Sequence, residues 1–94
     1  MDADKFPSIE HRITIISESQ YGYIHFGSEK EKFREVFPDG NFTVVFEGRS
    51  VENRKVDWGR NRINLYPLRK FINYGDILSF TRIGNTVYIE KKVK

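Results

Sequence analysis

The chain has 94 residues and a net charge of +3, and its 15% of aromatic residues is enough to form a hydrophobic core. It contains no cysteine, which excludes disulfides and thiolate metal sites and suits a reducing compartment. No apolar run approaches the ~20 residues that a membrane-spanning helix needs. We therefore expect one domain over residues 1–94 of a cytoplasmic protein, without membrane contact and with residues 1–8 as a flexible leader.

Two short strands are predicted near the N-terminus. In "HRITIIS", Ile13 and Ile15 alternate with Thr14, a pattern typical of a strand that buries one face. "YIHF" predicts a second strand, on which Tyr23 and His25 share one face. The polar residues 17–22 are expected to form the loop between these strands.

A helix is expected next, in "SEKEKFREVF". Ser28 and Glu31 have the spacing of a capping box, and Phe33, Val36 and Phe37 form one apolar stripe. The following "PDG" ends the helix.

The rest of the chain is predicted to be mostly β. Apolar alternation favours a strand in "NFTVVFEG", two weaker strands on either side of a "GRN" turn, and the pair "DILSFTRI" and "TVYIEKK" joined by "GN". "PLRKFI" predicts a short helical turn with Pro67 at its first position. The tally is a mainly β domain of about seven short strands and two short helices. So many strands protect their edges best by curling into a small barrel.

Enzymatic chemistry finds no support in the residue pattern. The two histidines, His11 and His25, belong to no HExxH motif, and no His, Asp and Glu residues have metal-ligand spacing. The glycine after "FE" lacks the spacing of a phosphate-binding loop. We expect no catalysis, no metal, no cofactor and no small-molecule substrate.

Residues 52–64 combine basic, aromatic and amide side chains on the weaker strand pair. Arginine can donate two hydrogen bonds to guanine, asparagine can bond adenine, and basic side chains neutralise phosphates. From Arg49 to Lys70 the chain has seven Arg or Lys residues against two acids, whereas residues 28–39 have three against four. This segment therefore indicates duplex DNA as a partner. The alternatives are a solvated edge hairpin and, for Trp58, a place in the core.

A second candidate segment is the polar loop before the second strand. Ser19, Gln20 and Tyr21 supply amide and hydroxyl hydrogen-bonding groups, and Tyr23 and His25 continue this set along the strand. By itself the loop is no different from many surface loops.

The order of elements resembles that of the B3 domain, the DNA-binding pseudobarrel of plant transcription factors and bacterial restriction-enzyme specificity domains. "REVFP" at residues 34–38 is similar to the helix end of that family, and "LRKFINYGDILSF" at residues 68–80 is similar to its signature of aromatic residue, turn, "GD" and hydrophobic strand. The resemblance covers roughly residues 9–91. The compact loops look more like the bacterial members than the plant ones.

The resemblance implies a seven-stranded open pseudobarrel that clamps a DNA major groove between two projections. One projection matches residues 17–25 and the other matches residues 55–64, so both are expected on the same side of the molecule. It also implies a recognition module of a restriction endonuclease, whose partner is a nuclease or motor domain in the parent protein or in another chain.

The candidate DNA-binding residues divide by expected role. Base contacts are expected from Arg60, Asn61 and Arg62, and from Ser19, Gln20 and Tyr21. Phosphates are expected to bind Arg49, Arg54 and Lys55, while Asp57 accepts from cytosine N4 or orients an arginine. The remaining members of the predicted interface are Tyr23, His25, Trp58 and Asn64.

Two other functions stay open at this point. A β-barrel with a basic hairpin could dock an acidic protein instead of DNA. Exposed Tyr21, Tyr23 and Trp58 could stack the bases of single-stranded nucleic acid.

Overall fold

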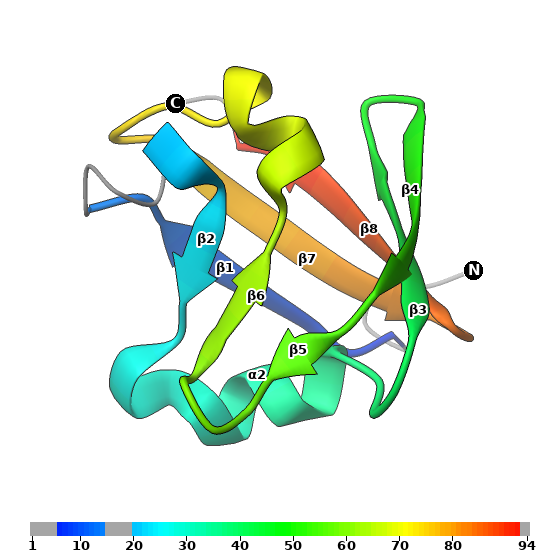
Figure 1. The fold of residues 1–94 in the computed structure, drawn as a ribbon. Helices are drawn as coiled ribbons and strands as arrows, with labels where there is room; N and C mark the ends of the chain where they lie inside the picture. The colour runs from blue at the N-terminus through cyan, green and yellow to red at the C-terminus, as the bar shows by residue number, and fades with distance from the viewer. Residues whose placement is uncertain (1–5, 15–19, 93–94) are drawn as a thin grey trace.

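The computed structural model describes residues 6–14 and 20–92 of the chain, shown as a ribbon in Figure 1. In chain order the described elements are β1 (Ser8–Arg12), β2 (Tyr23–His25), the 3-10 helix η2 (Gly27–Glu29), α2 (Lys30–Val36), β3 (Phe42–Phe46), β4 (Arg49–Arg54), β5 (Val56–Asp57), β6 (Arg62–Asn64), the 3-10 helix η3 (Tyr66–Phe71), β7 (Ile77–Ile83) and β8 (Thr86–Lys91).

These strands form two sheets, so the prediction of a mainly β domain is confirmed. The five-stranded sheet has the order β1-β7-β8-β3-β4, and the three-stranded sheet has the order β2-β6-β5. Neighbouring strands are antiparallel except β3 and β8, which are parallel. In Figure 1 the three-stranded sheet lies in front of the five-stranded one, and α2 lies across one end of both. Over the described residues the sheets do not close into a barrel.

The strands number eight in the described part of the chain, one more than expected, because one predicted strand is divided. Arg54 of β4 pairs with Phe42 in the larger sheet, whereas Val56 of β5 pairs with Ile63 in the smaller sheet. Asn53 has a φ of 58°, and the register of β3 against β4 shifts at this point. The chain therefore leaves one sheet and enters the other within the single residue Lys55.

The first strand lies earlier than predicted. β1 begins at Ser8, and the Arg82 amide donates to the carbonyl of Pro7, so the end of the expected leader is part of the sheet. The side chains of β1 alternate between exposed and half-buried, but Ile9 is the only aliphatic one that points inward. An alternation of apolar residues therefore could not predict this strand. Ile13 is buried directly after β1, while Ile15 and residues 16–19 of the predicted strand and loop lie outside the described residues.

The expected helix is present but starts differently. A 3-10 turn, η2, precedes α2, so Glu29 and not Ser28 occupies its N-cap position, without a side-chain cap hydrogen bond. Its apolar stripe is confirmed, because Phe33 and Val36 are buried. None of the helices over residues 6–14 and 20–92 has the length and apolar character to cross a bilayer.

The core is built around Phe33 of α2. Its ring stacks on Phe26 at 4.2 Å and on Phe37 at 5.8 Å, and it meets Phe80 of β7 edge-on at 6.0 Å. Phe33 and Phe80 are both 0% exposed. One aromatic cluster thus joins the helix to the strands, which fixes the inward faces of both sheets.

We expect Phe33→Ala to lower the free energy of unfolding by about 3–5 kcal/mol, because it leaves a cavity among three aromatic rings. Chemical denaturation of both proteins measures this difference. Tyr74→Ala is the control, since Tyr74 is 63% exposed and its loss should change stability by less than about 0.5 kcal/mol. Equal effects of the two substitutions would contradict the central place of Phe33.

Candidate nucleic-acid interface

The three-stranded sheet turns one polar face away from the core. Ile24, Val56 and Ile63 are buried on its inner side. Since successive side chains alternate, the residues between them point outward. These residues, here called the outward face, are Tyr23, His25, Asp57, Arg62 and Asn64. All five belong to the predicted interface, so the fold gathers them from two segments more than thirty residues apart in the sequence.

Arg62 occupies the centre of the outward face. It is paired in register with His25 on one side and Asp57 on the other. Its guanidinium carbon lies 4.4 Å from the centroid of the Tyr23 ring. A guanidinium stacked in this way uses its flat side for the ring and keeps its N–H groups, which lie in the plane, for hydrogen-bond acceptors. Arg62 is thus held in place without losing its donors.

Asn64 is partly engaged by the protein itself. Its Oδ1 accepts a 2.7 Å hydrogen bond from the Tyr66 amide, and its backbone carbonyl accepts one from Arg54 Nη1 at 3.2 Å. Bidentate bonding to adenine needs both a side-chain acceptor and a side-chain donor. The side-chain Oδ1 of Asn64 already accepts from the Tyr66 amide. The free NH₂ group of the Asn64 side chain is therefore better placed to bond a base.

The turn between β5 and β6 is anchored to the body of the protein and does not project, contrary to the sequence-based expectation. Lys30 Nζ of α2 donates to the carbonyl of Trp58 at 2.9 Å, and the Arg34 guanidinium lies 4.6 Å over the Trp58 ring. Phe26 packs on the same ring at 5.6 Å. Trp58 therefore lies partly buried against the core, as its alternative interpretation proposed.

Polar groups within this turn also bond to one another. Asp57 Oδ1 accepts from the Arg60 amide at 3.1 Å, and Asp57 Oδ2 lies 3.8 Å from Arg60 Nε. Of the two roles predicted for Asp57, orienting an arginine matches this geometry. Asn61 has a φ of 54°, and its Oδ1 is buried without a hydrogen-bond partner among the described residues. That oxygen is not placed to contact a base at the surface.

The second candidate segment lies at the other end of the same sheet. Gln20 and Tyr21 are exposed, and the Tyr21 ring lies 6.4 Å from that of Tyr23, while Ser19 lies outside the described residues. The Leu65 amide bonds the carbonyl of Gly22, whereas the Phe26 amide bonds the carbonyl of Asn61.

The two candidate segments therefore do not extend from a common end of the molecule. β2 lies between Gly22, which pairs with Leu65 after β6, and Phe26, which pairs with Asn61 before β6, so Gln20 and Arg60 lie beyond opposite ends of this strand pair. The antiparallel register of β2 and β6 sends the segments that flank them to opposite ends of the sheet, so the two expected projections do not leave the body at one end.

The three residues expected to bind phosphates differ in position. Lys55 is exposed at the junction of β4 and β5, and Arg54 is half-buried beside Asn64. Arg49 lies at the far end of β4, 4.0 Å over the Phe71 ring and 3.8 Å from Glu47. Its charge is partly balanced by that carboxylate, so Arg49 belongs less closely to the outward face than the other two.

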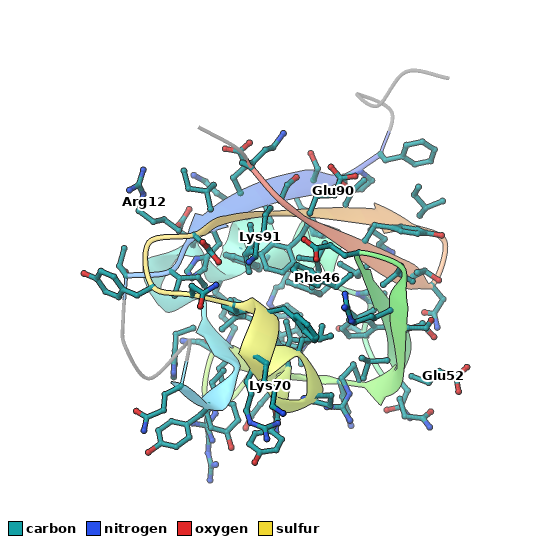
Figure 2. All side chains as sticks on the ribbon, turned by 90° about the horizontal axis from the view of Figure 1, so that it is seen from above. Arg12, Phe46, Glu52, Lys70, Glu90 and Lys91 are labelled. Carbon is teal, nitrogen blue, oxygen red and sulfur yellow. The ribbon has the colours of Figure 1, made fainter. Side chains whose placement is uncertain are left out.

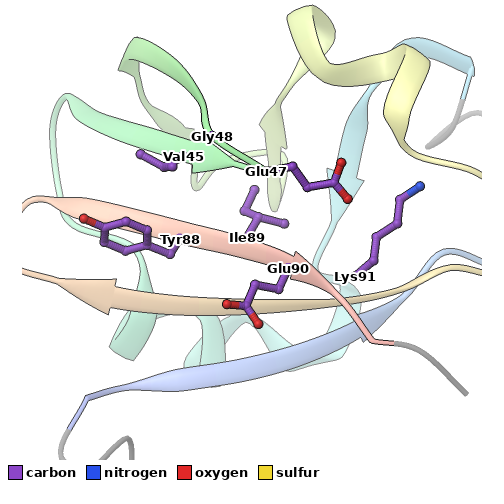
Figure 3. A pocket seen from close by; sticks show the side chains of 7 residues that line it. All are labelled: Val45, Glu47, Gly48, Tyr88, Ile89, Glu90 and Lys91. Atoms are coloured by element: carbon purple, nitrogen blue, oxygen red, sulfur yellow. The ribbon is translucent and has the colours of Figure 1, made fainter. Parts of the chain in front are cut away.

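A hollow of about 410 Å³ lies on the five-stranded sheet, away from the outward face. Figure 3 shows the side chains that line it, among them Glu47, Tyr88, Glu90 and Lys91. Glu47 pairs with Arg49 and Lys91 pairs with Asp76 at 3.3 Å. In the part of the chain that the structure describes, no group of three His, Asp or Glu side chains could hold a metal ion.

No family model, curated protein or solved structure matches the chain.

Only glycine fits at position 22, where the outward face meets η3. Its φ is 74°, and a Cβ added there would lie 2.7 Å from the Leu65 carbonyl oxygen. Gly40 has a φ of 77° with nothing within 4 Å of an added Cβ, so it provides a matched control.

We expect Gly40→Ala to cost about 1–2 kcal/mol from its backbone conformation alone. Gly22→Ala should cost roughly 1–3 kcal/mol more, because the backbone of Leu65 cannot move aside without disturbing the sheet. Thermal and urea unfolding of the two variants measures the difference. Equal losses would mean that β2 and η3 separate easily.

Proposed function

We propose that this protein is a sequence-specific double-stranded DNA-binding module that uses the outward face of β2-β6-β5. The observation that carries the proposal is the stacking of Arg62 on Tyr23 at the centre of that face. The stacking fixes the plane of the guanidinium and leaves its N–H groups available to acceptors. Fixed arginine donors are the commonest specific contact to guanine O6 and N7 in a major groove. The stacking reduces the side-chain entropy that such a contact would otherwise cost.

The charges around Arg62 favour an anionic partner. Among the described residues no carboxylate lies within ion-pair distance of Arg54, Lys55 or Arg62, and the nearby Asp57 is engaged with Arg60. Phosphates on either side of a groove would meet these basic side chains. The major groove is ~12 Å wide and admits a β-ribbon, and the outward face presents the strands β2, β6 and β5 to it. The duplex would therefore lie across the face, with Gln20 and Tyr21 at one wall and Arg60 at the other.

We further propose that the two sheets form one open pseudobarrel of B3 type. If β4 and β5 are counted as one bent strand, the order becomes β1-β7-β8-β3-β4/β5-β6-β2, with seven strands and free edges at β1 and β2. The order of elements along the chain agrees with the resemblance of "REVFP" and "LRKFINYGDILSF". In this proposal the module selects the target of a restriction endonuclease in the cytoplasm, and another domain or chain supplies cleavage.

The geometry bears on only one of the two alternative functions. Single-stranded binding would rely on Tyr21 and Tyr23, because the Trp58 ring is already occupied by Phe26 and Arg34. Docking of an acidic protein would use the same basic side chains as DNA.

A titration with labelled duplex and single-stranded DNA separates the three functions. We expect duplex binding at low salt that weakens as salt rises, since each neutralised phosphate releases counterions. Selection from a random duplex pool should then enrich one sequence. Stronger binding to the single strand would favour stacking, and no binding to either nucleic acid at low salt would leave the protein partner.

Arg62→Ala should reduce affinity for the selected duplex by about 1–3 kcal/mol and relax preference at one base pair. The matched control is Arg82→Ala near the end of β7, where Nε bonds the Gly84 carbonyl and the residue belongs to the five-stranded sheet, remote from the outward face. Competition binding against single-base variants of the selected site measures both effects. If Arg62→Ala weakens selected and random duplexes equally, Arg62 contacts the backbone and not a base.

A further inference from the structure

The 3-10 helix η3 carries basic side chains that the proposed recognition of bases does not use. It follows β6 after one residue, with a proline in its first turn. Its exposed or half-exposed residues Tyr66, Arg69 and Lys70 are here called the η3 ledge. The sequence pattern predicted a helical turn here. The position of its basic side chains beside the three-stranded sheet depends on tertiary packing.

Hydrogen bonds connect the η3 ledge directly to the outward face. The Tyr66 amide donates to Asn64 Oδ1, and the preceding Leu65 amide donates to the Gly22 carbonyl at 2.7 Å. The close approach of Gly22 to the Tyr66 backbone brings the start of β2 against the start of η3. The ledge therefore extends the outward face at the end where Gln20 and Tyr21 lie.

Arg69 is fixed twice within the ledge. Its Nη1 donates to the Tyr66 carbonyl at 3.0 Å, and its guanidinium carbon lies 3.8 Å over the Tyr66 ring. Tyr66 is 48% exposed, so the stacked pair lies at the surface. This arrangement repeats that of Arg62 on Tyr23. An arginine held in this way loses little freedom when it binds an anion.

Lys70 adds a second positive charge beside Arg69. In Figure 2 it projects on the side of the three-stranded sheet, whereas Glu90 lies on the opposite side of the molecule. Over the described residues, no acidic group lies within ion-pair distance of Arg69 or Lys70. Two uncompensated cations next to a stacked ring provide a site for the oxygens of a phosphodiester.

The opposite end of the outward face has a different charge balance. There, Lys30 is bonded to the Trp58 carbonyl and Arg34 covers the Trp58 ring. Glu31 and Glu35 of α2 are exposed at the surface. The exposed cations at this end, Lys32 and Arg60, are paired with the carboxylates of Glu29 at 3.7 Å and Asp57 at 3.8 Å, so this end offers less uncompensated positive charge to a phosphate backbone than the η3 ledge does.

We propose that the η3 ledge binds the sugar-phosphate backbone of the duplex whose bases lie over the outward face. The contact lies beyond the Gly22 end of the sheet, so the bound duplex extends toward η3 and away from α2. This inference rests on the proposed DNA binding and adds a phosphate contact made by Tyr66, Arg69 and Lys70.

The test is the salt dependence of duplex binding by Arg69→Gln, Lys70→Gln and the double variant. Each neutralised phosphate contributes about 0.9 to the slope of log affinity against log salt. The double variant should therefore lower that slope by about 1.8, with the same fold-loss of affinity on the selected and the random duplex. Lys92→Gln is the control, because it removes one exposed lysine charge from the five-stranded sheet side, where Lys92 pairs with Glu10 at 3.6 Å. Its slope should match that of the unaltered protein.

Four results would overturn the proposal, and they are distinguishable. An unchanged slope in the double variant, with normal duplex binding by the unaltered protein, removes the ledge and leaves the DNA-binding function. A changed selectivity with unchanged slope makes the ledge a base contact. If Lys92→Gln lowers the salt slope as much as Arg69→Gln or Lys70→Gln alone, the loss is due to net charge and not to the ledge. Absence of duplex binding by the unaltered protein at low salt rejects the ledge together with the proposed function. Thermal unfolding of each variant verifies that the fold is retained.

Discussion

The structure depends on one constraint, which is that both sheets and α2 must bury their inner faces on the same cluster of phenylalanine rings. Phe33 contacts Phe26, Phe37 and Phe80, so the helix, the start of η2 and the larger sheet meet at one point. Every strand of the small sheet then has a single solvent-facing side. The polar residues of β2 and β6 have no other place, and the outward face is the direct consequence of this packing.

The transfer of the chain from one sheet to the other at Lys55 is the second determinant of the site. β4 pairs with β3, but two residues later β5 pairs with β6. This bend brings Arg54 next to Asn64 and places Asp57 opposite Arg62. A straight strand would have kept these side chains in the larger sheet. The same feature makes the two sheets parts of one curved surface in the proposed pseudobarrel.

Arginines stacked on aromatic rings recur around the molecule, in the pairs Arg34–Trp58, Arg49–Phe71, Arg62–Tyr23 and Arg69–Tyr66. Their consequences differ with their surroundings. Arg34 holds the β5–β6 turn against α2, and Arg49 is balanced by Glu47. Arg62 and Arg69 have no carboxylate at ion-pair distance among the described residues and lie on connected surfaces. These two are therefore the ones that we propose to contact DNA.

The sequence by itself determined what depends on local pattern: the mainly β class, the strands rich in alternating apolar residues, the stripe of α2, and five residues that proved to share the outward face. It placed the first strand too late along the chain, because β1 has only one inward aliphatic residue and therefore a weak periodic signal. Only the tertiary structure decided that Trp58 packs near Lys30, 28 residues away, and that Gln20 and Arg60 lie at opposite ends of one sheet. Both depend on contacts and strand register between segments that are distant in the sequence. The local residue pattern of either segment does not specify such contacts.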